Sequence, residues 1–204
     1  VLSGDVAAGE RSVRRLVDTL ARFRPREVVY WCGGCYEKLL HQAPGFMEVP
    51  FRSQHVTKYL RDQLGGVTFE RRVEKTVTVH DPCSLGRMIG EHEPVRQLLA
   101  AIPGIELVEM GKSRAEALCC GSPTSSHAPE IAAVLTEKAL AEVRATGATT
   151  VATVCQGCQR RFGRSEPEQP FKVESFITLL GEGLGIGYED RLKRYIQYRD
   201  PERV

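Results

Sequence analysis

Short β-prone segments that end close to a cysteine recur along this chain. They are Val28–Trp31 before Cys32, Thr76–His80 before Cys83, and Thr150–Val154 before Cys155. Segments with helical apolar periodicity separate them. Alternating strands and helices predict an α/β fold with mostly parallel sheets. Because parallel strands present their carboxyl ends at one edge of a sheet, we expect loops from separate strands to bring distant cysteines together there.

Apolar periodicity and turn residues set the expected element boundaries. Helices are expected at 10–23, 36–41, 53–64, 94–101, 131–145, 175–180 and 192–198, and strands at 28–31, 76–80, 105–108 and 150–154. Ser53 is expected to cap the third of these helices, and Gly65-Gly66 to end it.

The chain contains an internal repeat. The segment VVYWCGGCYEKL (28–39) and the segment VATVCQGCQRRF (151–162) both read as a strand, a C-x-G-C motif and the start of a helix. They indicate two copies of one α/β unit. Only the second copy contains further cysteines upstream of its motif. The counterpart of Cys120 in the first copy would fall four residues before Val1, so we expect the chain to be the C-terminal portion of a longer polypeptide.

The seven cysteines cannot all pair with one another, since their number is odd. Five belong to the second copy: Cys83, Cys119, Cys120, Cys155 and Cys158. Adjacent cysteines form a disulfide only with strain, whereas soft thiolates suit an iron–sulfur cluster or zinc. Tetrahedral zinc and a cubane each need four ligands, so the fifth thiol favours an unusual cluster. A zinc-stabilised interaction module and a thiol–disulfide exchange protein remain the alternatives.

The spacing Cys83-x35-Cys119-Cys120-Gly121-x33-Cys155-x-x-Cys158, with the opening His80-Asp81-Pro82-Cys83, resembles the cysteine-rich CCG domain family. Its members include the B subunit of heterodisulfide reductase and the iron–sulfur subunits of glycolate oxidase, anaerobic glycerol-3-phosphate dehydrogenase and lactate-utilisation complexes. The resemblance implies two Rossmann-like units. Residues 1–72 would be the C-terminal part of a first CCG unit, and residues 73–204 a complete second unit with a C-terminal tail.

The resemblance also implies a [4Fe-4S] cluster on the five cysteines of the second copy, of non-cubane type in the heterodisulfide reductase branch. Cys32 and Cys35 would be half of a second site, for a cluster or zinc, whose other ligands lie outside these residues. The implied function is an iron–sulfur subunit that reduces a disulfide or relays electrons between a flavoprotein and an acceptor such as a quinone. His80 and His127 are candidate proton donors.

Composition narrows the class of partner. The formal net charge is only +2, which does not favour nucleic acid. No apolar run approaches the roughly 18 residues of a membrane span, so any membrane contact would be peripheral or through a partner. The sequence shows no dinucleotide fingerprint, so flavoprotein or ferredoxin-like iron–sulfur subunits are the expected partners. The N-terminus carries no secretory signal, and a cytoplasmic location is expected.

Overall fold

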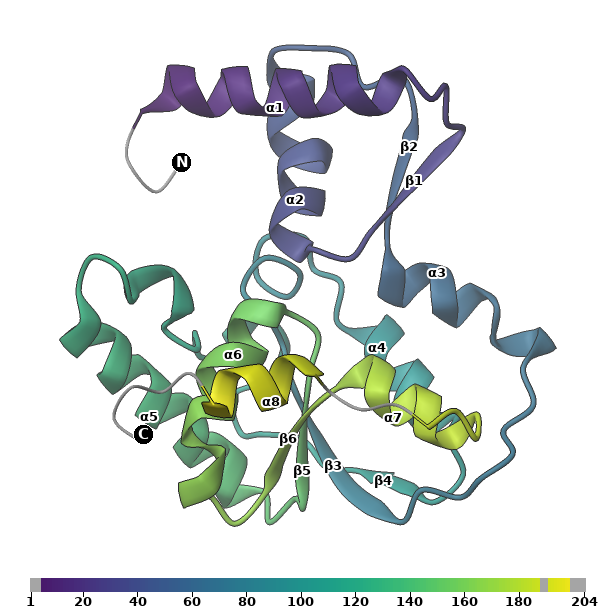
Figure 1. Cartoon of the computed structure of the whole chain (residues 1–204), viewed down its shortest axis with the longest axis vertical. Coiled ribbons are helices and arrows are strands. Elements are labelled where there is room, and N and C mark those ends of the chain that lie inside the picture. The colour runs from purple at the N-terminus through teal and green to yellow at the C-terminus, as the bar shows by residue number, and fades with distance from the viewer. Residues whose placement is uncertain (1–4, 188–190, 199–204) are drawn as a thin grey trace. The chain divides into compact units, whose positions relative to one another are not determined.

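A computed structural model of the chain describes residues 5–187 and 191–198. The chain divides into two compact units, 1–60 and 61–204, which are called the N-terminal and C-terminal units below. Each unit has a sheet whose strands are all parallel (Figure 1). The predicted α/β class with Rossmann-like parallel units is therefore confirmed. That a first CCG unit ends at residue 72 stays a prediction.

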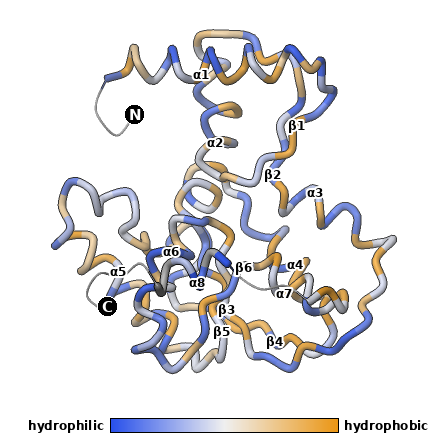
Figure 2. The backbone as a smooth tube through the Cα atoms, viewed as in Figure 1, coloured by the Kyte–Doolittle hydropathy of each residue, from blue (hydrophilic) through white to orange (hydrophobic). Residues whose placement is uncertain are grey.

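The N-terminal unit packs helices against a two-stranded sheet. Its elements are α1 (Val6–Ala21), β1 (Glu27–Tyr30), α2 (Gly33–Glu37), β2 (Arg52–His55) and α3 (Val56–Asp62). Asp5 begins α1, because its carboxylate accepts the N–H of Ala8 at 2.8 Å. Figure 2 shows α1 alternating between hydrophobic and hydrophilic residues, and the buried positions on it are Val13 and Val17. The helix therefore has one face in the core of this unit.

The predicted helix at 53–64 is wrong over its first residues. Ser53 is not a helix cap but lies in the middle of β2, where it is paired with Val28 of β1. The helix begins only at Val56. The polar run of β2 has no alternation that marks a strand, and parallel pairing with β1 decides its conformation.

The C-terminal unit contains a four-stranded sheet in the order β4-β3-β5-β6. Its elements are β3 (Lys75–His80), α4 (Glu93–Ala100), β4 (Ile105–Leu107), α5 (Pro129–Ala145), β5 (Thr150–Thr153), α6 (Gln156–Ser165), β6 (Lys172–Ser175), α7 (Phe176–Gly183) and α8 (Arg191–Tyr198). In this unit α5 packs against α6, and α4 packs against α7 (Figure 1). No helix within the described residues is long and apolar enough to cross a membrane.

The strand order places a topological switch point between β3 and β5. The chain leaves β3 through α4 to β4 on one side, and leaves β5 through α6 to β6 on the other side. In open α/β sheets, ligands bind beyond the carboxyl ends of the two strands at such a point. Cys83 follows β3, and Cys155 follows β5. The fold thus brings two of the predicted site loops to the place where a ligand site is expected.

The two units repeat the same series of elements, α–β–α–β–α. Glu27 of β1 and Thr150 of β5 are 123 positions apart, and the same offset places α1 on α5. The repeat seen in the sequence therefore extends beyond the C-x-G-C motif. It includes β2 and β6, the two strands that sequence patterns did not reveal, which are offset by 120 positions.

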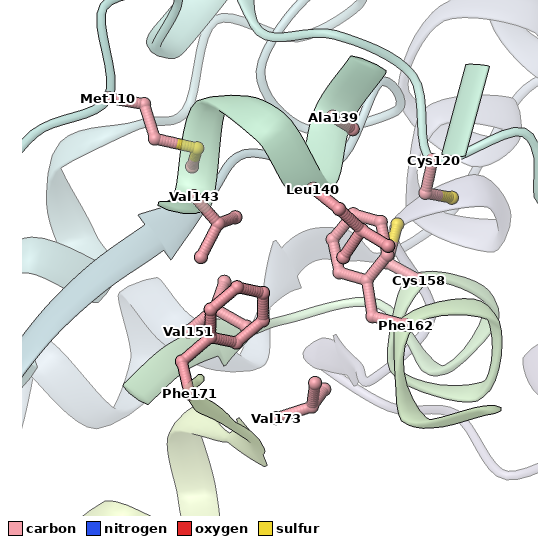
Figure 3. Packing of buried hydrophobic residues seen from close by; sticks show 10 residues of the cluster. All are labelled: Met110, Cys120, Ala139, Leu140, Val143, Val151, Cys158, Phe162, Phe171 and Val173. Carbon is pink, nitrogen blue, oxygen red and sulfur yellow. The ribbon is translucent and has the colours of Figure 1, made fainter. Parts of the chain in front are cut away.

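The hydrophobic core of the C-terminal unit reaches the predicted site. Its cluster consists of Met110, Cys120, Ala139, Leu140, Val143, Val151, Cys158, Phe162, Phe171 and Val173 (Figure 3). Two predicted ligands, Cys120 and Cys158, are members of this core, and both are buried. The site is therefore built on packed side chains, which limits the positions its thiols can take.

Candidate metal centre

The structure brings together the five cysteines of the second copy. Neighbouring thiols lie close enough to affect one another's ionisation, in the order Cys83, Cys119, Cys120, Cys158 and Cys155. They come from three segments: the turn after β3, the connection between β4 and α5, and the first turn of α6. Residues up to 75 positions apart in the chain thus share one site at the carboxyl edge of the sheet.

Gly121 lets the adjacent cysteines turn toward the other thiols. Its φ is 81°, in the left-handed region, and its N–H lies 3.4 Å from the Sγ of Cys119. A Cβ at this position would lie 2.5 Å from the carbonyl oxygen of Ala132 on α5. Thr136, also on α5, donates its hydroxyl to the carbonyl of Cys120 at 2.9 Å. The Cys-Cys-Gly turn is therefore held closely against α5.

The close thiols shift the pKa of one another. Hydrogen bonds from Cys120 and Cys83 lower the pKa of Cys119 far below the usual range of a thiol. The interaction with Cys119 in turn raises the pKa of Cys83, and it raises that of Cys120 to about 12. One thiolate therefore makes its neighbours harder to ionise. A bound cation would remove this opposition, because metal ligation requires thiolates and supplies positive charge.

Cys155 is the second thiol that favours ionisation. It is the N-cap of α6, and its sulfur lies close to the Cys158 thiol and to the first backbone N–H groups of the helix, those of Cys158 and Gly157. Together these interactions lower the pKa of Cys155 to about 6. The start of the helix thus stabilises a thiolate. Five soft sulfur donors in contact, two of them acidic, are a donor set that fits an iron–sulfur cluster.

An ion-pair network lies immediately behind the Cys83 turn. Arg96 on α4 is buried, and its five N–H groups are all used. Nη1 and Nη2 each donate to one carboxylate oxygen of Asp81 at 2.8 Å, Nε and Nη2 donate to Glu109, and Nη1 also donates to the carbonyl of His92. Burial raises the pKa of Asp81, but the hydrogen bonds from Arg96 outweigh it, and the pKa lies below its ordinary value. Asp81 therefore stays ionised.

This network also joins the two loops that carry cysteines. Asp81 accepts the backbone N–H of Arg114 at 2.7 Å, five residues before Cys119. Arg87, four residues after Cys83, donates to the carbonyl of Ala117 at 2.7 Å. Sequence reasoning missed Arg96, because its partner Asp81 lies 15 positions away in the chain.

The two candidate proton donors lie in different surroundings. His80 is the last residue of β3 and is buried, and burial lowers its pKa to about 4. One of its ring nitrogens and the Sγ atoms of Cys120 and Cys158 all lie within 4.8 Å of one another. His127 is exposed, in the loop before α5. A role in proton transfer stays a prediction for both.

Cys32 and Cys35 lie in the N-terminal unit, and both are exposed. Cys32 is the N-cap of α2, and its Sγ accepts the N–H of Cys35 at 3.4 Å. Burial and the hydrogen bond to Cys32 raise the pKa of Cys35 to about 11. Within the described part of this unit, no other cysteine accompanies the pair. Its metal-binding role stays a prediction.

The fold and the clustered thiols define a cysteine-rich α/β domain. Comparison with protein families agrees: residues 77–163 match the family described as the cysteine-rich domain, CCG. This segment begins in β3, ends in α6 and includes all five clustered cysteines. The chain thus carries a CCG cysteine-rich domain, and the resemblance predicted from the sequence is confirmed.

Known proteins similar to this chain are redox proteins and their components. It is 33% identical to the D component of dihydromethanophenazine:CoB–CoM heterodisulfide reductase of Methanosarcina acetivorans over 171 residues, 80% of this chain and 42% of that protein. It is 34% identical to the B component of fumarate reductase (CoM/CoB) of Methanothermobacter marburgensis, over 80% of this chain and 32% of that protein. It is 30% identical to the probable iron-sulfur-binding oxidoreductase FadF of Bacillus subtilis, over 64% of this chain and 20% of that protein.

The chain spans less than half the length of each of these relatives. Their names describe reductase subunits and an iron–sulfur oxidoreductase, which supports an iron–sulfur redox class. The heterodisulfide reductase relatives are the D component of that enzyme, whereas the sequence suggested likeness to its B component.

Proposed function

We propose that this chain is an iron–sulfur electron-transfer or catalytic part of a heterodisulfide-reductase-like oxidoreductase. Its cofactor would be a [4Fe-4S] cluster, of non-cubane type, held by the five clustered cysteines. One observation carries the proposal: five thiols from three loops form a continuous series of neighbours beyond the strands at the topological switch point of a parallel sheet. Zinc or a cubane cluster needs only four ligands. A fifth thiol beside the other four therefore favours an iron–sulfur cluster with more than four protein ligands.

The surrounding residues support this role. Cys119 and Cys155 are the thiols most easily ionised, so they would bind metal first. Core packing around Cys120 and Cys158 excludes water from one side of the site. Cys83 and Cys119 are only partly buried, which leaves the other side accessible to a reactant. The cluster supplies electrons one at a time when bound, and its potential depends on burial and hydrogen bonding.

The reaction proposed for this site is reduction of a disulfide, RSSR + 2e⁻ + 2H⁺ → 2RSH, or transfer of electrons to an acceptor such as a quinone. A flavoprotein or a ferredoxin-like iron–sulfur subunit would supply the electrons, because the sequence shows no flavin fingerprint. His127 is exposed and could supply a proton to a bound disulfide. The proposed location is the cytoplasm, with any membrane contact peripheral.

At Cys32 and Cys35 we propose the second, incomplete site, for iron–sulfur or zinc, with ligands from outside the described residues. The structural repeat supports this proposal, because both C-x-x-C motifs follow a parallel strand and begin a helix. Cys32 corresponds to Cys155, and Cys35 corresponds to Cys158.

The test is metal and acid-labile sulfide content of anaerobically purified protein, with a visible absorption spectrum. The expected result is about four irons with matching sulfide at the C-terminal site, lost in Cys119→Ser. The matched control is Cys32→Ser, which should leave that iron in place, since Cys32 lies in the other unit. Zinc without sulfide or visible absorbance would contradict the redox function and favour a structural zinc module.

A thiol–disulfide exchange function has a separate signature. It requires an accessible low-pKa thiol and no metal. Metal-free protein in which iodoacetamide modifies Cys155 fastest, and which reduces a model disulfide at the same rate after chelation, would replace the cluster proposal.

A further inference from the structure

His80 has an unsatisfied ring nitrogen, and its side chain lies beside two of the thiols. Its Nε2 is fully buried and has no hydrogen-bond partner among the described residues. The side chain lies at the end of β3, paired in register with Thr153 of β5, so it is at the switch point itself. Buried polar atoms in native proteins nearly always have a partner, because leaving one unpaired costs its desolvation free energy. The orphaned nitrogen therefore requires an explanation.

The position of the imidazole ring is well determined. The ring packs against Phe162 of α6 in a T-shaped arrangement, with the centroids 4.7 Å apart. Phe162 is fully buried in the core that also contains Cys120 and Cys158. Packing on one side and the thiols on the other leave the ring little freedom to turn toward solvent.

The other buried histidine provides a comparison. His55 of the N-terminal unit is fully buried, and both of its ring nitrogens have partners: Nδ1 lies 2.9 Å from the Thr57 hydroxyl, and Nε2 lies 3.1 Å from the carbonyl of Trp31. This is the pattern of a structural histidine. At His80, by contrast, one ring nitrogen lies within 4.8 Å of the sulfurs of Cys120 and Cys158.

We propose that the missing partner of His80 is the cofactor, so that His80 is a sixth residue in direct contact with it. The contact is either a bond from the imidazole nitrogen to a metal ion or a hydrogen bond from its N–H to a sulfur. A donor set that combines imidazole nitrogen with thiolate sulfur suits both iron and zinc. This inference rests on the proposed metal-binding function, and it adds a nitrogen contact to a site predicted from cysteines alone.

The test is pulsed electron paramagnetic resonance on the full chain, purified anaerobically after growth with ¹⁵N-histidine as the only labelled amino acid. The expected result is a ¹⁵N coupling to the paramagnetic cluster, strong for a metal–nitrogen bond and weak for an N–H to sulfur contact. Absence of any histidine ¹⁵N coupling would overturn the proposal. The wild-type measurement stands even if a variant fails to fold.

Two variants assign the coupling. His80→Phe keeps an aromatic ring against Phe162 and should abolish the coupling, either with loss of iron or with a more negative reduction potential. His55→Phe is the matched control, and it should leave coupling and potential unchanged. A coupling that survives His80→Phe would overturn the assignment.

The test also distinguishes failure of the proposed redox function from failure of the proposed His80 contact. If metal analysis finds zinc instead of iron, the redox function fails, and the same labelled protein is loaded with cadmium for NMR spectroscopy. A cadmium-dependent shift of one histidine ring nitrogen, lost in His80→Phe, would then support the contact, and unchanged histidine signals would overturn it.

Discussion

The two C-x-x-C motifs have the same local backbone structure but lie in different environments. In both units the first cysteine is the N-cap of a helix that follows a parallel strand. Cys32 and Cys35 are exposed, and no other cysteine of the described part of their unit accompanies them, whereas Cys158 is buried and belongs to a group with three further thiols besides Cys155. The strand–helix turn therefore positions two sulfurs in each unit. Whether they belong to a larger site depends on the cysteines that neighbouring loops supply.

The difference is visible at the helix before each motif. In the N-terminal unit a cavity of about 320 Å³ lies beside Cys35, lined in part by Gly9 and Ser12 of α1. Ala132 of α5 corresponds to Gly9 through the 123-residue offset, and its backbone contacts Gly121 of the Cys-Cys-Gly turn. The position that contacts the turn in the C-terminal unit thus corresponds to a residue that lines this cavity in the N-terminal unit.

Buried charge gives a second contrast. The C-terminal unit holds the ionised Arg96, Asp81 and Glu109 behind its site. The N-terminal unit has the neutral His55, which lies 6.0 Å from the ring of Tyr36. Removal of one partner leaves an ionic network with an unpaired buried charge, which lowers stability. A buried neutral histidine lowers stability when it gains a proton. Both units hold a buried neutral histidine, His55 or His80, but only the C-terminal unit has this ionic network, so it should be the more sensitive to loss of an ion-pair partner.

Arg96→Met should have the largest effect. It leaves Asp81 buried without its main partner, and breaking a buried ion pair costs about 3–5 kcal/mol. Hydrogen exchange of β5 peptides should show the C-terminal unit destabilised by that amount. Arg72→Met is the control, since its pair with Glu74 is exposed and is worth less than about 1 kcal/mol. Equal effects of the two variants would show that the network does not hold the site.

Acid should destabilise the N-terminal unit through His55. Burial lowers its folded-state pKa to about 4, against 6.5 when unfolded. The stability it contributes is complete above pH 6.5 and is lost as the pH falls from 6.5 to 4, by about 3 kcal/mol in total. Trp31 is the only tryptophan and lies in this unit, so its fluorescence during urea unfolding reports the change. In His55→Phe this part of the pH dependence should disappear, and its persistence would assign it to other groups.

Gly34→Ala and Gly157→Ala form the smallest and most closely matched comparison. Alanine favours a helix over glycine by about 1 kcal/mol. At Gly34 the new Cβ would meet only the Sγ of Cys32, at 3.9 Å, so stability should rise. At Gly157 it would lie 3.1 Å from the Ser122 hydroxyl, so the gain should be cancelled. Urea unfolding of each unit checks this, and an equal gain in both would show that the Cys-Cys-Gly segment is loosely packed.

Much of the architecture could be predicted from the sequence. The strands before Cys32, Cys83 and Cys155, the helix at 131–145 and the repeat were all recognisable, because each has a strong local pattern. β2 and β6 were missed, since four-residue strands with polar residues become strands only by pairing with β1 and β5. The helix cap predicted at Ser53 was wrong for the same reason.

The sequence by itself determined the cysteine set, its spacing and the α/β class, because residue type and periodicity are local properties of the chain. Only the tertiary structure decided which thiols touch, that Asp81 is held by Arg96, and that the Nε2 of His80 has no partner within the described protein. These depend on strand order and on contacts between residues far apart in the chain. No local pattern records such contacts, since their energies exist only once the sheet has formed.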